Sequence, residues 1–474
     1  MTTLEYEASP AEWARNHFGG AEMSDIRRVD RLITIAEAMA LSPGQTLPQM
    51  FAQRYDLKAA YNFFALPEAT PAHIQAGHRE WVSLALHQPG LYLCLEDTTE
   101  PSWPERDAIA GLGPVGGSKD RKIGFLLHST LVVRAWADEN EHTARRGAVE
   151  ILGFADQQYH VRQPAPPGET KTQRQKRARE SQLWLRSTAV LGPAPDDPAV
   201  QWRRVCDRGA DIFESLVRYR ECGHEFTIRA TQDRALVDRV SGETCGYLFS
   251  TMRAEEAFPR VLELPLRARP GQAARTAQLS LSAVLVQVRS PRTEWAHQEV
   301  LAVRVWEETP PAGVEPLEWL LLGSPEPPSF EAARRNCRYY ATRWVVEEFH
   351  KGLKTGLQVE ALQLATGARL MAATAVMSVV ALRLLDLREA ARHTPDAPAE
   401  QSHLNEVALQ VLAAATKREL RTIREVTLAL GRLGGHLNRK GDGLPGWQTL
   451  WRGWQRLQEM VIGFELAHKL NKFG

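Results

Sequence analysis

The sequence predicts an α/β fold in which a mixed β-sheet is flanked by helical segments at both ends. Short apolar runs follow one another between residues 91 and 154, and strands then alternate with helices up to about residue 230. This order favours a sheet with both antiparallel and parallel strands. Residues 10 to about 70 and roughly the last 75 residues instead show helical periodicity. At 474 residues the chain is long enough for two or three domains.

Composition excludes few classes of protein. The 58 basic and 57 acidic residues leave a net charge of +1, so a nucleic-acid binder would need its positive charge gathered in one groove. Five cysteines without a Cys-x2-Cys pair argue against a disulfide framework and a zinc site, and fit a reducing cytoplasm. Residues 1–9 do not look like a signal peptide. The longest apolar run, Leu370 to Leu382, predicts a buried helix and no membrane span.

The N-terminal helical segment carries a group of arginines. Ser24 and Asp25 offer an N-cap for a helix whose apolar face begins at Val29. Arginines share another face near the positive end of this helix, where phosphate could be held: Arg27, Arg28 and Arg31. Ordinary surface arginines are the alternative.

Two apolar runs each end at an aspartate. Leu91 to Leu95 predicts a central strand that stops at Glu96-Asp97-Thr98-Thr99. A second strand ends at Asp207, and a helix follows. Either aspartate could be a ligand, although Asp207 could also simply cap the helix. Asp211, one turn further on, is expected to be structural.

The next part of the chain favours β structure. Residues 225–229 predict a strand ending at Arg229, and residues 231 to about 316 alternate β-favouring runs with Pro and Gly. Pro316 to Leu322 then predicts a return to the core, and it contains Trp319. A tryptophan beside a leucine run is more often a core residue than a ligand contact. Residues 171–179 form a basic run, typical of a solvated surface or of a nucleic-acid contact.

Residues 340–354 predict one helix, because they lack Pro and contain no Gly before Gly352. At about 100° per residue, four polar side chains fall within roughly 60° of one another. They are Tyr340, Arg343, Glu347 and Lys354. A solvated charged face with a local ion pair would give the same pattern.

The spacing Tyr-x2-Arg-x3-Glu-x6-Lys resembles the signature of the IS4 family of DDE transposases. The flanking residues 343–356, Arg-Trp-x2-Glu-Glu-Phe-His-Lys-x2-Lys-Thr-Gly, are similar to its Tn5-like members. Glu-Asp-Thr-Thr at 96–99 and Cys-Asp-Arg-x-Ala-Asp at 206–211 resemble the settings of the family's two aspartates. Gly209 departs from the pattern, since Tn5-like members have an acidic residue there.

The resemblance implies a domain plan. Residues 1–72 would be a helical domain that binds transposon end DNA. Residues 73–390 would be a ribonuclease H-like catalytic domain with a β insertion at about 231–316. Residues 391–474 would be a helical dimerisation domain.

The resemblance also implies the site. Asp97, Asp207 and Glu347 would be catalytic and hold two Mg²⁺ ions, with Mn²⁺ as a substitute, because Mg²⁺ prefers oxygen ligands. Trp319 would stack on a flipped base. The other DNA contacts would be Tyr340, Arg343, Lys354, Lys351, Arg229, Arg27, Arg28 and Arg31.

The implied function is cut-and-paste transposition of DNA. The protein would bind double-stranded transposon ends and target DNA as a homodimer in a synaptic complex. We expect it to act in the bacterial cytoplasm and not to bind a membrane. A catalytically inactive DNA-binding repressor remains an alternative, which the three intact carboxylates disfavour. An unrelated metal-dependent nuclease is another, and the Tyr-Arg-Glu-Lys stripe and Trp319 argue against it. A glycosidase would need two carboxylates and no metal.

Overall fold

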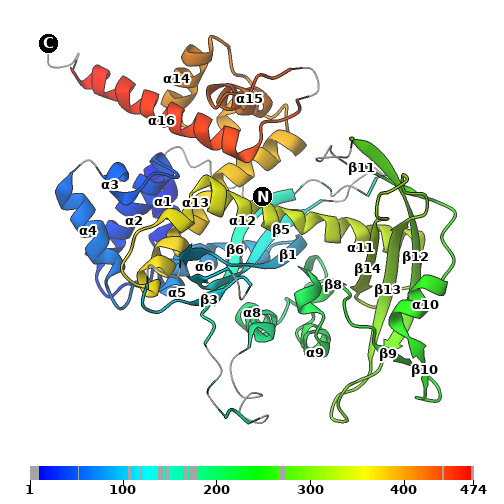
Figure 1. Cartoon of the computed structure of the whole chain (residues 1–474). Helices are drawn as coiled ribbons and strands as arrows, with labels where there is room; N and C mark the ends of the chain where they lie inside the picture. The colour runs from blue at the N-terminus through cyan, green and yellow to red at the C-terminus, as the bar shows by residue number, and fades with distance from the viewer. Residues whose placement is uncertain are drawn as a thin grey trace.

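The N-terminal part of the chain is helical, as predicted. The computed structural model describes residues 10–51, 53–104, 108–117, 120–136, 143–144, 147, 149–163, 166, 168–170, 179–266, 273–402, 404–439 and 442–470. Asp25 caps α2 by accepting a hydrogen bond of 2.9 Å from the backbone N–H of Arg27. The helices lie together beside the sheet (Figure 1). They are α1 (Pro10–Phe18), α2 (Ile26–Leu41), α3 (Leu47–Met50), α4 (Arg54–Phe64), α5 (Pro71–Ile74) and α6 (Ala76–Leu86).

A mixed sheet forms the centre of the molecule, with β1 (Gly90–Thr99) between β5 (Leu126–Ala135) and β7 (Val200–Cys206). β1, β5 and β6 (Val149–His160) are antiparallel neighbours. On the other side of β1, β7 and β8 (Glu225–Arg229) are parallel to it. The parallel strands follow α8 (Leu183–Leu191) and α9 (Phe213–Glu221). Of the basic run at 171–179, only Arg179 lies inside the described residues.

We predicted that this strand stops at the polar stretch Glu96 to Thr99, but β1 continues through it. Pairing with β5 continues through Asp97 opposite Ser129 and Thr99 opposite Leu127. The neighbouring strand supplies hydrogen-bond partners to this polar stretch, so the chain stays extended beyond its apolar part. Asp97 therefore lies inside a strand.

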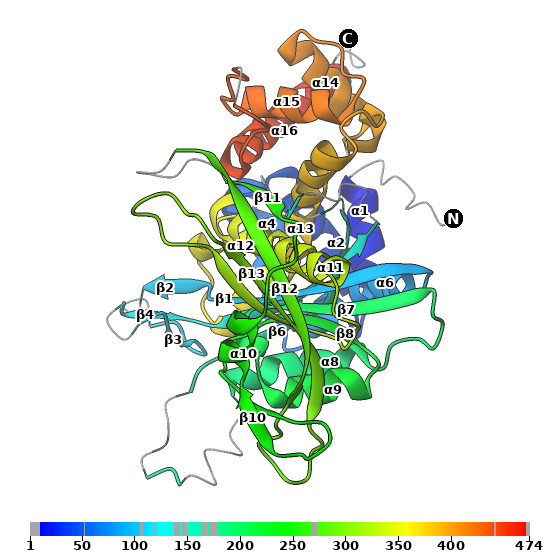
Figure 2. The ribbon, with the colours of Figure 1, turned by 90° about the vertical axis from the view of Figure 1, so that its right-hand side faces the viewer.

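The β-rich second half extends the same sheet. Among the described residues the sheet has eleven strands, and β14 joins its two halves by pairing antiparallel with β8. A separate three-stranded sheet projects beside β1 (Figure 2). The remaining elements of this half are β9 (Ala235–Val237), β10 (Thr244–Tyr247), α10 (Leu248–Ala254), β11 (Leu262–Leu266), β12 (Arg275–Val288), β13 (Gln298–Glu307) and β14 (Glu318–Gly323). The small sheet consists of β2 (Ser102–Pro104), β3 (Gly113–Val115) and β4 (Lys122–Gly124).

The single helix predicted over 340–354 is also wrong. α11 (Phe330–Thr342) ends before Arg343, and α12 (Trp344–Lys351) begins after it. The backbone N–H of Arg343 bonds to the carbonyl of Tyr340 at 3.1 Å, three residues back, which tightens the helix at this point. A π-helical turn, Gly352–Gly356, follows α12.

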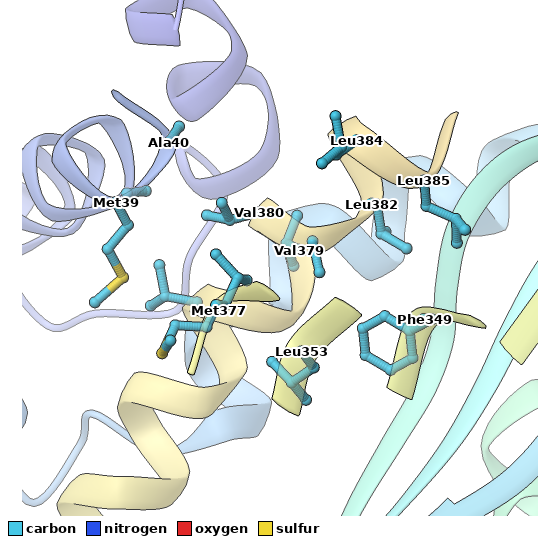
Figure 3. Packing of buried hydrophobic residues seen from close by; sticks show 14 of the residues in the cluster. Met39, Ala40, Phe349, Leu353, Met377, Val379, Val380, Leu382, Leu384 and Leu385 are labelled. Atoms are coloured by element: carbon cyan, nitrogen blue, oxygen red, sulfur yellow. The ribbon is translucent and has the colours of Figure 1, made fainter. Parts of the chain in front are cut away.

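The helix α13 (Gly367–His393) is the core of the molecule. Its side chains pack between those of α2 and α12, as Met39, Val380 and Phe349 illustrate in Figure 3. By length and composition α13 could cross a membrane, but 89% of its apolar window is buried inside the protein. The buried helix predicted around 370–382 is therefore confirmed.

The C-terminal helices lie together at one end of the molecule (Figure 2), and α16 contacts the end of α2. They are α14 (Glu406–Thr416), α15 (Ile423–Leu433) and α16 (Trp447–Leu470). The indole N–H of Trp454 donates to the carbonyl of Ala40 at 3.4 Å. The Arg383 guanidinium of α13 lies over the rings of both Trp13 and Trp454, at 5.1 and 5.6 Å. One arginine thus contacts the two helical ends of the chain.

Gly356 gives a test of this packing. A Cβ atom there would overlap the indole of Trp451 in α16. We expect Gly356→Ala to lower the free energy of unfolding by about 1–3 kcal/mol, because the ring must move. Urea denaturation measures this. Gly463→Ala is the control, since nothing lies within 4 Å of that position on α16, and it should be neutral or stabilising. Equal effects of the two changes would contradict the packing.

Candidate active site

The structure brings the three predicted carboxylates together. Asp97 lies in β1, and Asp207 directly follows β7. Glu96 pairs with Cys206 across these parallel strands, so the two aspartates continue from the same level of the sheet. Glu347 reaches them from α12, and the charges of both aspartates act on it.

Arg343 joins two of these carboxylates. Its guanidinium donates to Asp97 Oδ2 at 2.9 Å and also forms an ion pair with Glu347. The side chain is only 11% exposed. Burial opposes its charge, but Asp97, Tyr340 and Glu347 together raise the pKa of Arg343. The guanidinium is therefore the fixed positive charge of the site.

Asp207 and Glu347 lie in an environment that disfavours their charge. Burial raises the pKa of Asp207, and the charge of Asp97 adds to the effect. Burial also raises the pKa of Glu347, against the opposing pull of Arg343. Burial lowers the pKa of His350 to about 3, so its ring, 3.9 Å from Asp97, is neutral at pH 7. A cation placed among these groups would relieve the repulsion.

The carboxylate oxygens suit a hard cation such as Mg²⁺. Within the described part of the chain, no three Asp, Glu, His or Cys side chains already stand as one set of metal ligands. Arg343 bonds to both Asp97 and Glu347, so its guanidinium stands where a cation shared by these two carboxylates would lie. The donor set fits a divalent ion, provided that the guanidinium gives up one of its two carboxylates.

Asp207 also caps the turn that follows it, as its place in the sequence predicts. Its Oδ1 accepts the backbone N–H of Gly209 at 3.0 Å and so caps a short 3₁₀ turn. A Cβ at Gly209 would overlap the ring of Trp184, which explains why this chain has glycine there. Asp211 is structural: it accepts two backbone N–H groups and pairs with Arg234 at 2.6 Å.

Three of the predicted DNA contacts lie around the ring of a fourth, Tyr340. Trp319 packs edge-on against Tyr340, with centroids 5.6 Å apart at 64°. The guanidinium of Arg229 lies 6.0 Å from the Tyr340 ring, and that of Arg343 lies 5.5 Å away. Residues from β8, β14 and the junction of α11 with α12 thus form one aromatic and basic cluster beside the carboxylates.

The two lysines lie after this cluster along the chain. Lys354, in the π-helical turn, donates to the carbonyl of Glu100 at 2.7 Å, just beyond β1. It also lies 3.8 Å from Glu360. Lys351, the last residue of α12, is exposed. Because the predicted helix is divided, Lys354 contacts the end of β1 and does not continue a single stripe.

The N-terminal arginines are each paired with a carboxylate. Arg27 pairs with Asp25 and is 86% exposed. Arg28 pairs with Glu68, while Arg31 pairs with Asp56 at 2.9 Å. These contacts order the arginines on α2, and they leave Arg27 the most accessible to solvent.

Residues 10–69 match the family model described as transposase DNA-binding. The match spans α1 to α4 and includes the three arginines. It supports a transposase that binds DNA.

Sequence reasoning missed several residues that support the site. Glu96 and Arg204 form a fully buried ion pair beneath Asp97. Glu348, beside Glu347, pairs with Arg388 of α13 at 2.9 Å. The one available signal was the pair of adjacent arginines, Arg203 and Arg204, inside a predicted buried strand, because buried charges are rare unless paired.

The raised pKa of Asp207 gives a prediction about stability. A carboxyl whose pKa is higher in the folded chain costs stability as pH rises through that value. We expect Asp207→Asn to raise the free energy of unfolding at pH 7 in EDTA. The gain should vanish below the ordinary pKa of 3.8, where both side chains are neutral.

Urea denaturation between pH 3 and 8 checks this prediction. Asp211→Asn is the matched control, because it breaks a buried ion pair and should lower stability by about 3–5 kcal/mol. Destabilisation by both changes at pH 7 would count against a raised pKa of Asp207 in the folded chain.

Proposed function

We propose that this protein is a DDE transposase of the IS4 family, similar to its Tn5-like members. It would cut transposon end DNA and join it to target DNA by metal-dependent phosphoryl transfer. The observation that carries the proposal is the meeting of Asp97, Asp207 and Glu347 beside the Tyr340 cluster. The transposase DNA-binding match at residues 10–69 supports the same conclusion.

The fold fits this proposal. Three consecutive antiparallel strands, β1, β5 and β6, are followed by β7 and β8, each parallel to its neighbour and separated by α9. That order supports a ribonuclease H-like catalytic domain over residues 73–390. Residues 1–72 would then bind the transposon end, and residues 391–474 would dimerise. Exposed apolar residues on α16 support the last assignment: Met460, Ile462, Phe464, Leu466 and Leu470.

Asp97, Asp207 and Glu347 would hold two Mg²⁺ ions, with Mn²⁺ as a substitute. When bound, the ions would help to activate a water or 3′-hydroxyl and stabilise the leaving oxygen. Arg343 would exchange a carboxylate for a DNA phosphate. Tyr340 and Lys354 would help to hold that phosphate in position, and Lys351 would add charge nearby.

The DNA steps follow from the family resemblance. A nick at the transposon end frees a 3′-hydroxyl, which attacks the opposite strand and closes a hairpin. Water reopens the hairpin, and the resulting end is joined to target DNA. Trp319 would stack on a base flipped out at the hairpin, and Arg229 would contact the backbone beside it. The reaction would take place in a homodimer that holds two ends, in the bacterial cytoplasm.

A second candidate is a DNA-binding repressor without catalysis. The observation that favours it is that the matched family segment, residues 10–69, covers DNA binding alone. In that case Arg343 would stay bonded to Asp97 and Glu347, and no metal would replace it.

Cleavage separates the two candidates. Short duplexes from the DNA flanking this reading frame are incubated with the protein and Mg²⁺, then run on a denaturing gel. We expect a nick followed by a hairpin, both lost to background in Asp97→Ala. Glu419→Gln, at an exposed ion pair with Arg421, should keep full activity.

Each other outcome has a defined meaning. Binding without cleavage in Mg²⁺ and in Mn²⁺ would favour the repressor. Cleavage without a hairpin or strand joining would favour a metal-dependent nuclease on this fold.

The N-terminal arginines predict a salt dependence. Neutralising one phosphate contributes about −0.9 to the slope of log K against log salt. We expect Arg27→Gln to weaken binding to end duplexes and to reduce the slope by about that amount, measured by fluorescence anisotropy between 50 and 200 mM salt. Arg421→Gln, at an exposed C-terminal position, should leave the slope unchanged. An unchanged slope for Arg27→Gln would remove it from the phosphate contacts.

A further inference from the structure

A charged pair lies fully buried beneath the carboxylates. Glu96 precedes Asp97 in β1, so its side chain points to the opposite face of the sheet. There it pairs with Arg204 of β7, three residues before Asp207. Neither side chain is exposed to solvent at all.

Glu96 has further hydrogen-bond partners in β5, β7 and α9. Thr130 of β5 donates to its Oε1 at 3.0 Å, and the Cys206 thiol donates to its Oε2 at 3.0 Å. The Tyr219 hydroxyl of α9 lies 3.4 Å from Oε2, and His128 Nε2 lies 3.8 Å from Oε1. One carboxylate therefore connects both neighbouring strands of β1 and the helix that follows Asp207.

This connection bears on two of the three site carboxylates. Glu96 stands opposite Thr130 in one strand and Cys206 in the other. The residues that follow Glu96 and Cys206 are Asp97 and Asp207. Any shift of β1 against β7 would break the bonds to Glu96 and would also change the separation of the two aspartates.

Stability alone is a poor explanation for the pair. The free energy needed to move two charges out of water offsets much of the attraction between them. Well-packed apolar residues often stabilise a protein equally well. Outer residues that orient metal ligands typically change metal affinity by 10–100-fold. A pair that adds little stability but fixes two strand ends is suited to positioning.

We propose that Glu96 and Arg204 are positioning residues that set Asp97 against Asp207 for metal binding. This inference rests on the proposed metal-dependent function. The pair touches neither substrate nor metal, and it acts through the strands that carry the two aspartates.

The test separates positioning from stability by replacing both partners. Glu96→Leu and Arg204→Met alone should each lower the urea midpoint, because each leaves an unpaired buried charge. The double variant should recover most of that midpoint. Its dissociation constant for Mn²⁺ should still be weakened about 10–100-fold, measured on the full chain without DNA by electron paramagnetic resonance of free Mn²⁺.

A matched control is available in the far half of the sheet. Glu307 and Arg275 form a second ion pair, with the Glu307 side chain 3% exposed, in β13 and β12. The double change Glu307→Leu with Arg275→Met should leave Mn²⁺ affinity unchanged. Cys206→Ala removes the thiol bond to Glu96 and the longer thiol contact with the Tyr219 hydroxyl, and it leaves the Glu96–Arg204 pair in place. It should weaken the affinity several-fold and serves if the double variant does not fold.

The possible results separate the positioning role of Glu96 and Arg204 from the metal site itself. Wild-type Mn²⁺ affinity in the Glu96/Arg204 double variant, or in Cys206→Ala if that double variant does not fold, would overturn the positioning pair and leave the carboxylate site standing. Wild-type affinity in Asp97→Asn and Glu347→Gln would instead overturn the metal site, and the positioning pair with it. Equal weakening by the Glu307/Arg275 control would also overturn the positioning pair.

Discussion

The candidate site depends on positive charges that neutralise three carboxylates in a partly buried place. Three carboxylates that approach one another repel, and burial strengthens the repulsion. Arg343 supplies the opposing charge directly, through Asp97 and Glu347. Further arginines act one residue away from the site: Arg204 pairs with Glu96 beside Asp97, and Arg388 pairs with Glu348 beside Glu347. An arginine–glutamate ion pair therefore lies next to the site both in the strand that carries Asp97 and in the helix that carries Glu347.

The break between α11 and α12 also helps to neutralise these carboxylates. A continuous helix would keep Arg343 in register with Glu347, but the tightened turn at Arg343 also lets its guanidinium reach Asp97 of the sheet. Glu348 then holds α12 against α13 through Arg388 and Arg392. Because most residues of α13 are buried in the largest hydrophobic core, this contact fixes the position of Glu347.

Much of this could be predicted from sequence, for reasons of packing. Apolar runs gave the strands that carry Asp97 and Asp207 and the buried α13, because burial selects such runs wherever they occur. The helix break could not be predicted, since no Gly or Pro marks it. The extension of β1 through polar residues depends on a partner strand distant in sequence. The Glu96–Arg204 pair was missed because each residue alone is typical of a surface, and only the fold brings them together.

Under the proposed function Arg343 would have two roles that it cannot fulfil at once, which are to hold a DNA phosphate and to neutralise both Asp97 and Glu347. It shares the Tyr340 ring with Arg229 and Trp319, on the side of the site suited to DNA, and it also neutralises Asp97 and Glu347. A phosphate that draws the guanidinium away leaves these carboxylates uncompensated, which favours a cation among them. A cation there in turn releases the guanidinium for phosphate. Since such coupling must be reciprocal, DNA and metal would each strengthen the binding of the other through this one side chain.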